Sequence, residues 1–218
     1  MTFFANFKRS AKELGNIRSL AVTAILIALD LVLKAFVTIR FPAPIGKISV
    51  AFLALAAIGM LYGPVVGALA AAITDILGLV VSQEISAFNP MYTLVEVTAG
   101  FLYGLFLYNI SVVKPDFSGG KAFFKSIVSN WGSFLRIVAA KLFVILICNI
   151  FMTNLAHLIT GYIAPEAFEA TLSISIGKNF IKMPFDVVLM LLTMYPINAA
   201  YNRVFRRGKL RVGADVEL

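Results

Sequence analysis

The sequence predicts an all-α fold, an integral membrane bundle of six transmembrane helices with both termini in the cytoplasm. Apolar residues make up 60% of the 218 residues, and the mean hydropathy is +0.91. They fall in six long blocks, and a helix needs about 20 apolar residues to cross a bilayer core of about 30 Å. Short polar segments between the blocks carry most of the lysines and arginines. We therefore expect a multi-pass protein of the cell membrane with no separate soluble domain.

Each predicted span is an apolar run bounded by residues that favour turns. Pro42 and Pro44 end the first span, because proline lacks a backbone donor and restricts the residue before it. Gly63-Pro64 joins the second span directly to the third and predicts a tight hairpin. The turn-rich segment 114–121 follows the fourth span. The expected spans are residues 19–39, 48–62, 64–82, 92–112, 131–160 and 176–202, with an amphipathic segment at 121–130 before the fifth.

The distribution of positive charge predicts the orientation, because cytoplasmic loops of membrane proteins are enriched in lysine and arginine. The first 18 residues hold four of them, the segment 112–130 holds three and the C-terminal tail holds five. These three segments are expected in the cytoplasm, and the loops after the first, third and fifth spans face outward. The predicted organisation is a basic N-terminal segment at 1–18 that suits an interfacial helix, a transmembrane domain at 19–202 and a basic tail at 203–218.

Several classes of function are excluded by composition and missing motifs. The net charge of +8 would suggest nucleic acid in a soluble protein, but here it predicts contact with the cytoplasmic leaflet of the bilayer. The single cysteine, Cys148, allows no disulfide and no CxxC pair. Gly120-Lys121 lacks the spacing of a phosphate-binding loop, and neither GxSxG nor HExxH occurs. We expect no enzyme, no cofactor and no metal site.

Charged residues inside the predicted spans are the main functional signal, because each costs about 2.5–3.5 kcal/mol at bilayer depth unless a partner or a polar cavity receives it. Asp30 and Lys34 are four residues apart, as are Lys182 and Asp186, so each pair is interpreted as an intrahelical bridge. Asp75 is expected to accept hydrogen bonds from a neighbouring span. The other charges inside the spans are Glu96, Arg136, Lys141 and Lys178.

Glu96 and Lys178 lie near the predicted outer ends of their spans. Glu96 is expected either to line a cavity between the outer loops or to pair with Lys141 or Lys182, and the sequence leaves both open. Lys178 and Asn179 are expected to meet a ligand carboxylate, the alternative being that Lys178 extends to the membrane interface.

The fifth span carries a polar stripe near its outer end. Asn149, Thr153 and His157 share one helical face, and Asn154 lies beside them. Such a stripe is too polar to face lipid, so we expect it to line a ligand site and to form hydrogen bonds between helices.

Seven segments, taken in order, resemble a known family. They are AILIA at 24–28, GMLYGPVVG at 59–67, AITDILG at 72–78, FNPMYTL at 88–94, GFLYGLFLY at 100–108, the polar segment at 149–154 and KNFIKMP at 178–184. Their order and spacing resemble the S components of energy-coupling factor (ECF) vitamin transporters, and the folate family most closely. The resemblance covers most of residues 19–200.

The resemblance implies a vitamin-binding subunit of the bacterial plasma membrane. Such a subunit captures its ligand from outside and associates with a transmembrane coupling subunit and two cytoplasmic ATPases. Ala24 and Ala28 would form the small-residue face that docks onto the coupling subunit, although the same spacing also serves internal packing.

With folate as the first candidate ligand, Glu96 would accept hydrogen bonds from the pterin edge, while Lys178 and Arg40 would meet the glutamate carboxylates. Phe88 and Tyr92 would cover the rings. The expected ligand-binding set is Glu96, Lys178, Asn179, Arg40, Phe88, Tyr92, Thr93, Asn154 and His157. Riboflavin and pantothenate are alternative ligands. Two other classes stay open: a stand-alone secondary transporter with Asp75 or Glu96 as proton relay, and a structural membrane subunit without a ligand.

Overall fold

The structure is a computed structural model that describes residues 3–37, 39–40, 47–110, 112, 118–121, 125 and 131–214. The helices are α1 (Phe3–Glu13), α2 (Ile17–Phe36), α3 (Phe52–Tyr62), α4 (Pro64–Val81), α5 (Pro90–Leu107), α7 (Trp131–Phe143), α8 (Thr153–Ile159) and α9 (Phe168–Ala214). The shorter elements are the strands β1 (Ile39–Arg40) and β2 (Lys47–Ile48), the 3-10 turns η1 (Ile85–Ala87) and η3 (Pro165–Ala167), and the π-helical segment η2 (Val144–Met152). The predicted helical fold is confirmed, apart from one antiparallel ladder of two residue pairs.

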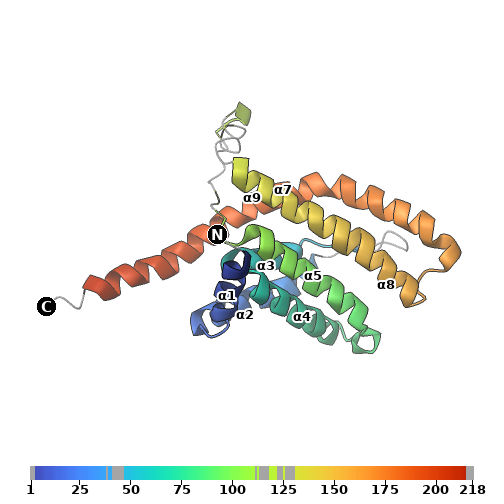
Figure 1. Cartoon of the computed structure of the whole chain (residues 1–218), viewed down its shortest axis with the longest axis horizontal. Helices are drawn as coiled ribbons and strands as arrows, with labels where there is room; N and C mark the ends of the chain where they lie inside the picture. The colour runs from blue at the N-terminus through green and yellow to red at the C-terminus, as the bar shows by residue number, and fades with distance from the viewer. Residues whose placement is uncertain are drawn as a thin grey trace.

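The helices form an elongated bundle. Figure 1 shows α4 and α5 side by side, α7 and α8 as one continuous rod, and α9 extending past the bundle toward the C-terminus. In the part of the chain that the structure describes, five helical stretches are long and apolar enough to cross a membrane: Ile17–Phe36, Pro64–Val81, Pro90–Leu107, Trp131–Ile159 and Pro165–Phe205. The amphipathic segment expected at 121–130 lies almost entirely outside the described residues.

The expected second span is shorter than the sequence predicts. Helix α3 has 11 residues and rises about 16 Å, which is too little to cross a bilayer core. Strand β2 and a turn precede it, and in the turn the Ser49 hydroxyl accepts a hydrogen bond from the Ala51 backbone (3.2 Å). Eight of its residues are buried, so protein rather than lipid encloses this helix. Six full-length spans are therefore not confirmed, and the orientation of the termini stays a prediction.

Glycines let the backbones of α3, α4 and α5 touch. A Cβ atom at Gly59 would lie 2.6 Å from the Gly104 backbone nitrogen, and one at Gly67 would lie 2.5 Å from the Gly100 carbonyl oxygen. Neither distance is tolerated, so the close approach requires glycine. The spacing of Gly100 and Gly104 therefore serves internal packing.

The predicted hairpin at Gly63-Pro64 is confirmed, since α3 ends at Tyr62 and α4 begins at Pro64. Gly63 has a φ of +86°, which favours glycine. The buried Ser10 hydroxyl of α1 accepts hydrogen bonds from the backbone of Val65 (3.0 Å) and Val66 (3.3 Å). Helix α1 thereby caps the start of α4 and holds the predicted cytoplasmic end of the bundle.

Candidate functional site

The start of α5 positions three of the predicted site residues. The Asn89 side chain accepts a hydrogen bond from the backbone two residues later (3.0 Å), and Pro90 occupies the first helical turn, where its missing donor costs nothing. This start places Tyr92, Thr93 and Glu96 within the first two turns of α5, at the predicted outer end of the bundle.

Four charged residues from α2, α4 and α5, which we call the acidic cluster, lie at this end: Asp30, Lys34, Asp75 and Glu96. The Lys34 Nζ atom lies 2.8 Å from Asp30 Oδ2, which confirms the predicted bridge along α2. The Thr93 hydroxyl donates a hydrogen bond to Asp75 Oδ2 (2.7 Å). This confirms the prediction that Asp75 accepts a hydrogen bond from a neighbouring span. Lys34 also lies within electrostatic range of Glu96 and Asp75.

Glu96 differs from the other carboxylates inside the helices. Asp30 pairs with Lys34, Asp75 accepts from Thr93, and Asp186 pairs with a lysine. Among the described residues, no hydrogen bond or ion pair reaches the half-buried Glu96 carboxylate. The proposed pairing with Lys141 or Lys182 is not formed, because both lysines contact Asp186. The acceptor capacity of Glu96 is therefore open to a ligand.

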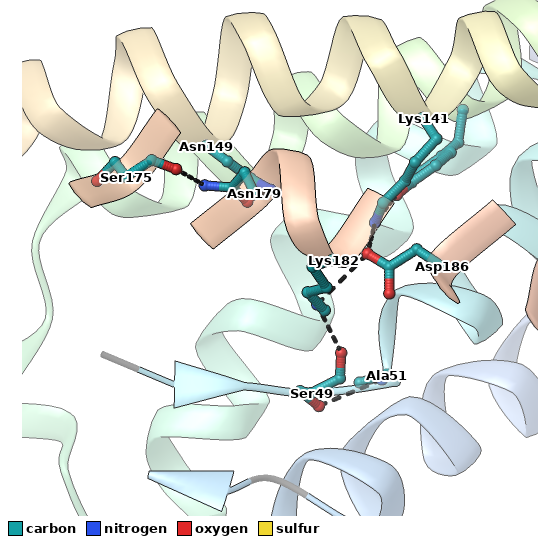
Figure 2. A network of polar contacts seen from close by, with 9 residues as sticks. Ser49, Ala51, Lys141, Asn149, Ser175, Asn179, Lys182 and Asp186 are labelled. Atoms are coloured by element: carbon teal, nitrogen blue, oxygen red, sulfur yellow. Dashed lines mark hydrogen bonds and ion pairs between the residues drawn. The ribbon is translucent and has the colours of Figure 1, made fainter. Parts of the chain in front are cut away.

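A second group from α7 and α9, the basic cluster, comprises Lys141, Lys178, Lys182 and Asp186. Lys141 Nζ lies 2.9 Å from Asp186 Oδ2, and both side chains are 3% exposed. Lys182 Nζ lies 3.5 Å from the same oxygen (Figure 2). The ring of Phe52, at the start of α3, lies under the Lys141 ammonium at 3.6 Å. Lys178, one turn from Lys182 on α9, lies within electrostatic range of it.

The Lys182–Asp186 bridge predicted from sequence exists, but it is the weaker of two contacts. Asp186 is held chiefly by Lys141 on another helix, and Lys141 also donates to the Tyr103 hydroxyl (3.4 Å). The sequence rule considers only neighbours on one helix, so it could not find a partner 45 positions away. The sequence signal for this ion pair was that Lys141 and Asp186 each lie inside an apolar block, where a charge needs a partner.

Amide side chains join η2 and α8 to α9. Asn149 Nδ2 donates to Asn179 Oδ1 (3.1 Å), and Asn179 Nδ2 donates to the Ser175 carbonyl (2.8 Å) (Figure 2). The Ser175 hydroxyl donates to Asn154 Oδ1 (3.3 Å). The predicted hydrogen bonding between helices is confirmed. Asn154 and Asn179 are buried, and ligand contact by either one stays a prediction.

The π-helical segment η2 was not predicted. Such segments are rare and frequently occur at functional sites. The wider turn continues to Thr153, whose backbone N–H and side-chain hydroxyl both bond to the Cys148 carbonyl, five residues earlier. Asn149 lies within this segment.

Tyr92 and His157 close the outer end between α5 and α8. The Tyr92 hydroxyl lies 2.7 Å from His157 Nδ1 and 3.3 Å from the Thr160 hydroxyl. The His157 ring packs 5.5 Å from the Tyr92 ring and 4.9 Å from the Tyr162 ring. Tyr92 and His157 are half-buried and Tyr162 is exposed, and a role for Tyr92 in covering a ligand stays a prediction.

The remaining predicted residues lie around the bundle. Phe88 is 45% exposed just before α5. The backbone of Arg40 forms β1, and its side chain lies outside the described part of the structure. Ala24 and Ala28 lie on the exposed face of α2, which contradicts internal packing as their role.

The carboxylates of the acidic cluster come from α2, α4 and α5, and the ammonium groups of the basic cluster come from α7 and α9; Tyr103, in the second half of α5, accepts from Lys141 and lies within electrostatic range of Glu96. Within the described residues, no group of three His, Cys, Asp or Glu side chains could hold a metal ion.

Comparisons with known proteins bear on the family and the fold. The family described as "ECF transporter, substrate-specific component" matches residues 18–194. The folate transporter FolT of Clostridium novyi (strain NT) is 33% identical over 89 residues, which are 41% of this chain and 50% of that protein. The match thus spans about half the length of this curated relative. A crystal structure described as FolT bound with folic acid superposes with a TM-score of 0.63 at 24% identity, over 80% of this chain and 91% of that one, and shows the same fold.

Proposed function

Because this chain belongs to the family of substrate-specific components of ECF transporters, we propose that it captures folate from the extracellular side of the bacterial plasma membrane. It delivers the vitamin inward together with a transmembrane coupling subunit and two cytoplasmic ATPases. It is a binding and transport subunit rather than an enzyme. The similarity to FolT proteins supports folate as the ligand.

The observation that carries this proposal is the Glu96 carboxylate. It is half-buried on an apolar helix and, within the described residues, has no hydrogen bond or ion pair. A charge at this depth is costly unless a partner receives it. A carboxylate can accept two hydrogen bonds from the amino-pyrimidinone edge of a pterin. The neighbouring Tyr92 and His157 rings would cover the heterocycle.

The first experiment is mass spectrometry of the freshly purified, denatured protein. A tightly bound vitamin survives purification, so the expected result is the mass of folate. If the mass of riboflavin or pantothenate were found instead, that vitamin would be the ligand and the proposed S-component function would stand. No small molecule, together with no binding of added vitamins, would favour a structural subunit.

The second experiment is a folate titration of two variants. Loss of a charge-assisted hydrogen bond is expected to weaken binding about 10- to 100-fold in Glu96→Gln. Lys178→Ala is expected to weaken it as well. Glu166→Gln, at the exposed turn before α9, is the matched control and should bind normally. Unchanged affinity in both site variants would remove the proposed site.

A stand-alone secondary transporter is the alternative mechanism. Proteoliposomes that hold this chain alone, with an imposed proton gradient, should take up no folate. Adding the coupling subunit, the ATPases and ATP should start uptake. Gradient-driven uptake by the chain alone would instead assign Asp75 or Glu96 as a proton relay.

The exposed Ala24–Ala28 face of α2 is the proposed docking surface for the coupling subunit. Ala28→Leu should reduce copurification with that subunit because the added side chain prevents close helix approach. Folate affinity of the isolated chain should not change.

A further inference from the structure

The charges of the acidic and basic clusters are segregated by sign. The acidic cluster has three carboxylates and one lysine, whereas the basic cluster has three lysines and one aspartate. Helix α5 contacts both clusters, because Thr93 donates to Asp75, and Tyr103 accepts from Lys141 and lies within electrostatic range of Asp186 and Glu96. A ligand bound against both clusters would therefore meet hydrogen-bond acceptors from one and ammonium donors from the other.

Within the basic cluster, Lys182 is the loosely held cation. The Lys141 Nζ atom lies 2.9 Å from Asp186 Oδ2 and 3.6 Å from the centre of the Phe52 ring. The same distances for Lys182 are 3.5 Å and 5.5 Å. Its side chain is 24% exposed, against 3% for Lys141.

The second partner of Lys182 does not neutralise it. Lys182 Nζ donates to the Ser49 carbonyl at 3.4 Å, a long contact with an uncharged oxygen (Figure 2). An ammonium has three N–H donors, so a strong acceptor can still be added. One Asp186 carboxylate between two ammonium groups leaves a surplus positive charge at bilayer depth, which an additional anion would compensate.

We infer that Lys182 binds a carboxylate of the ligand and thereby sets the direction in which the ligand lies. This inference rests on the proposed function. The donor-rich pterin edge faces Glu96 in the acidic cluster, and a glutamate carboxylate of folate is bound by Lys182 in the basic cluster. The site selects elongated molecules with hydrogen-bond donors at one end and a carboxylate at the other, so a neutral vitamin such as riboflavin would bind poorly.

The test compares two ligands in the purified full-length chain: folic acid, and its diamide, in which both glutamate carboxylates are replaced by carboxamides. Lys182→Gln should weaken folic acid binding about 10- to 100-fold, the size expected for a lost charge-assisted contact. It should leave diamide affinity within about twofold of wild type, which also shows that the variant is folded. Lys182→Arg, which keeps the charge, should retain the preference for folic acid.

The controls separate the two ideas. Lys12→Gln, on α1 at the opposite end of the bundle, should change neither affinity. If wild type binds folic acid and Lys182→Gln weakens both ligands equally, or neither, Lys182 does not bind a carboxylate and the inference is overturned while the proposed function stands. If wild type binds neither ligand, the proposed function itself is overturned.

Discussion

Different interactions hold the helices together within the two halves of the bundle. In the α3–α4–α5 half, glycine contacts bring backbones together and leave little room for adjustment. In the α7–η2–α9 half, ion pairs and amide hydrogen bonds join the helices through long side chains. Polar contacts between side chains can exchange partners when a ligand arrives, whereas close-packed backbones cannot. The first half is thus a rigid support, and the second carries the groups able to respond.

The largest effect is expected from removing the buried Lys141–Asp186 ion pair of the α7–η2–α9 half, the polar half. Asp186→Asn leaves the Lys141 ammonium buried without a counter-charge and should cost about 3–5 kcal/mol of stability, measured by thermal unfolding in detergent. Adding Lys141→Met should recover much of the loss, because the buried charge is then gone. Glu169→Gln, exposed in the first turn of the same helix, is the control. Equal stability of Asp186→Asn and wild type would contradict this account of α9.

A smaller loss is expected from breaking the glycine half. Gly100→Ala would push its Cβ into the Gly67 carbonyl and the Ala71 side chain, with an expected cost of about 1–3 kcal/mol. Gly132→Ala, where a Cβ meets nothing within 4 Å, should leave the protein as stable as wild type or slightly more so. If both substitutions behaved alike, close packing would not be what holds α4 against α5.

The smallest effect is expected at the hydrogen bond between the Asn149 and Asn179 side chains in the polar half. A double-mutant cycle of Asn149→Ala and Asn179→Ala should give a coupling energy of about 0.6 kcal/mol, typical of hydrogen bonds between membrane helices. Asn149→Ala combined with Asn202→Ala, whose partner is Asn198 on the same helix, should be additive. An additive result for Asn149 and Asn179 would mean that this bond adds nothing to the contact between η2 and α9.

Features that depend on near neighbours in sequence were predictable. The Asp30–Lys34 bridge follows from a spacing of four, and the hairpin at Gly63-Pro64 follows from the conformations those two residues favour. Most helix positions follow from the length of the apolar blocks. Two helices are exceptions. Helix α3 is shorter than predicted, because apolar composition alone does not distinguish a helix enclosed by protein from one that crosses lipid. Helix α9 (Phe168–Ala214) continues past both ends of the span expected at 176–202 and into the expected tail.

The contacts among the expected site residues were predicted in part. Residues Tyr92 and His157 were expected near the mouth, and the structure brings them within hydrogen-bond distance. The expected ligand residue Thr93 instead bonds to Asp75. Partner choice among distant charges could not be predicted, since any lysine of one apolar block can pair with any carboxylate of another until the helices are placed.

The sequence by itself determined that this is a membrane protein of helical spans with charged and polar groups inside them, because hydropathy and turn chemistry act over a few residues. Only the tertiary structure decided that Lys141 takes Asp186, that Lys182 is left loosely held and that Glu96 has no bonded partner in the described part. Coulomb attraction and hydrogen bonding depend on distances between helices, and those distances follow from how glycines and apolar side chains pack.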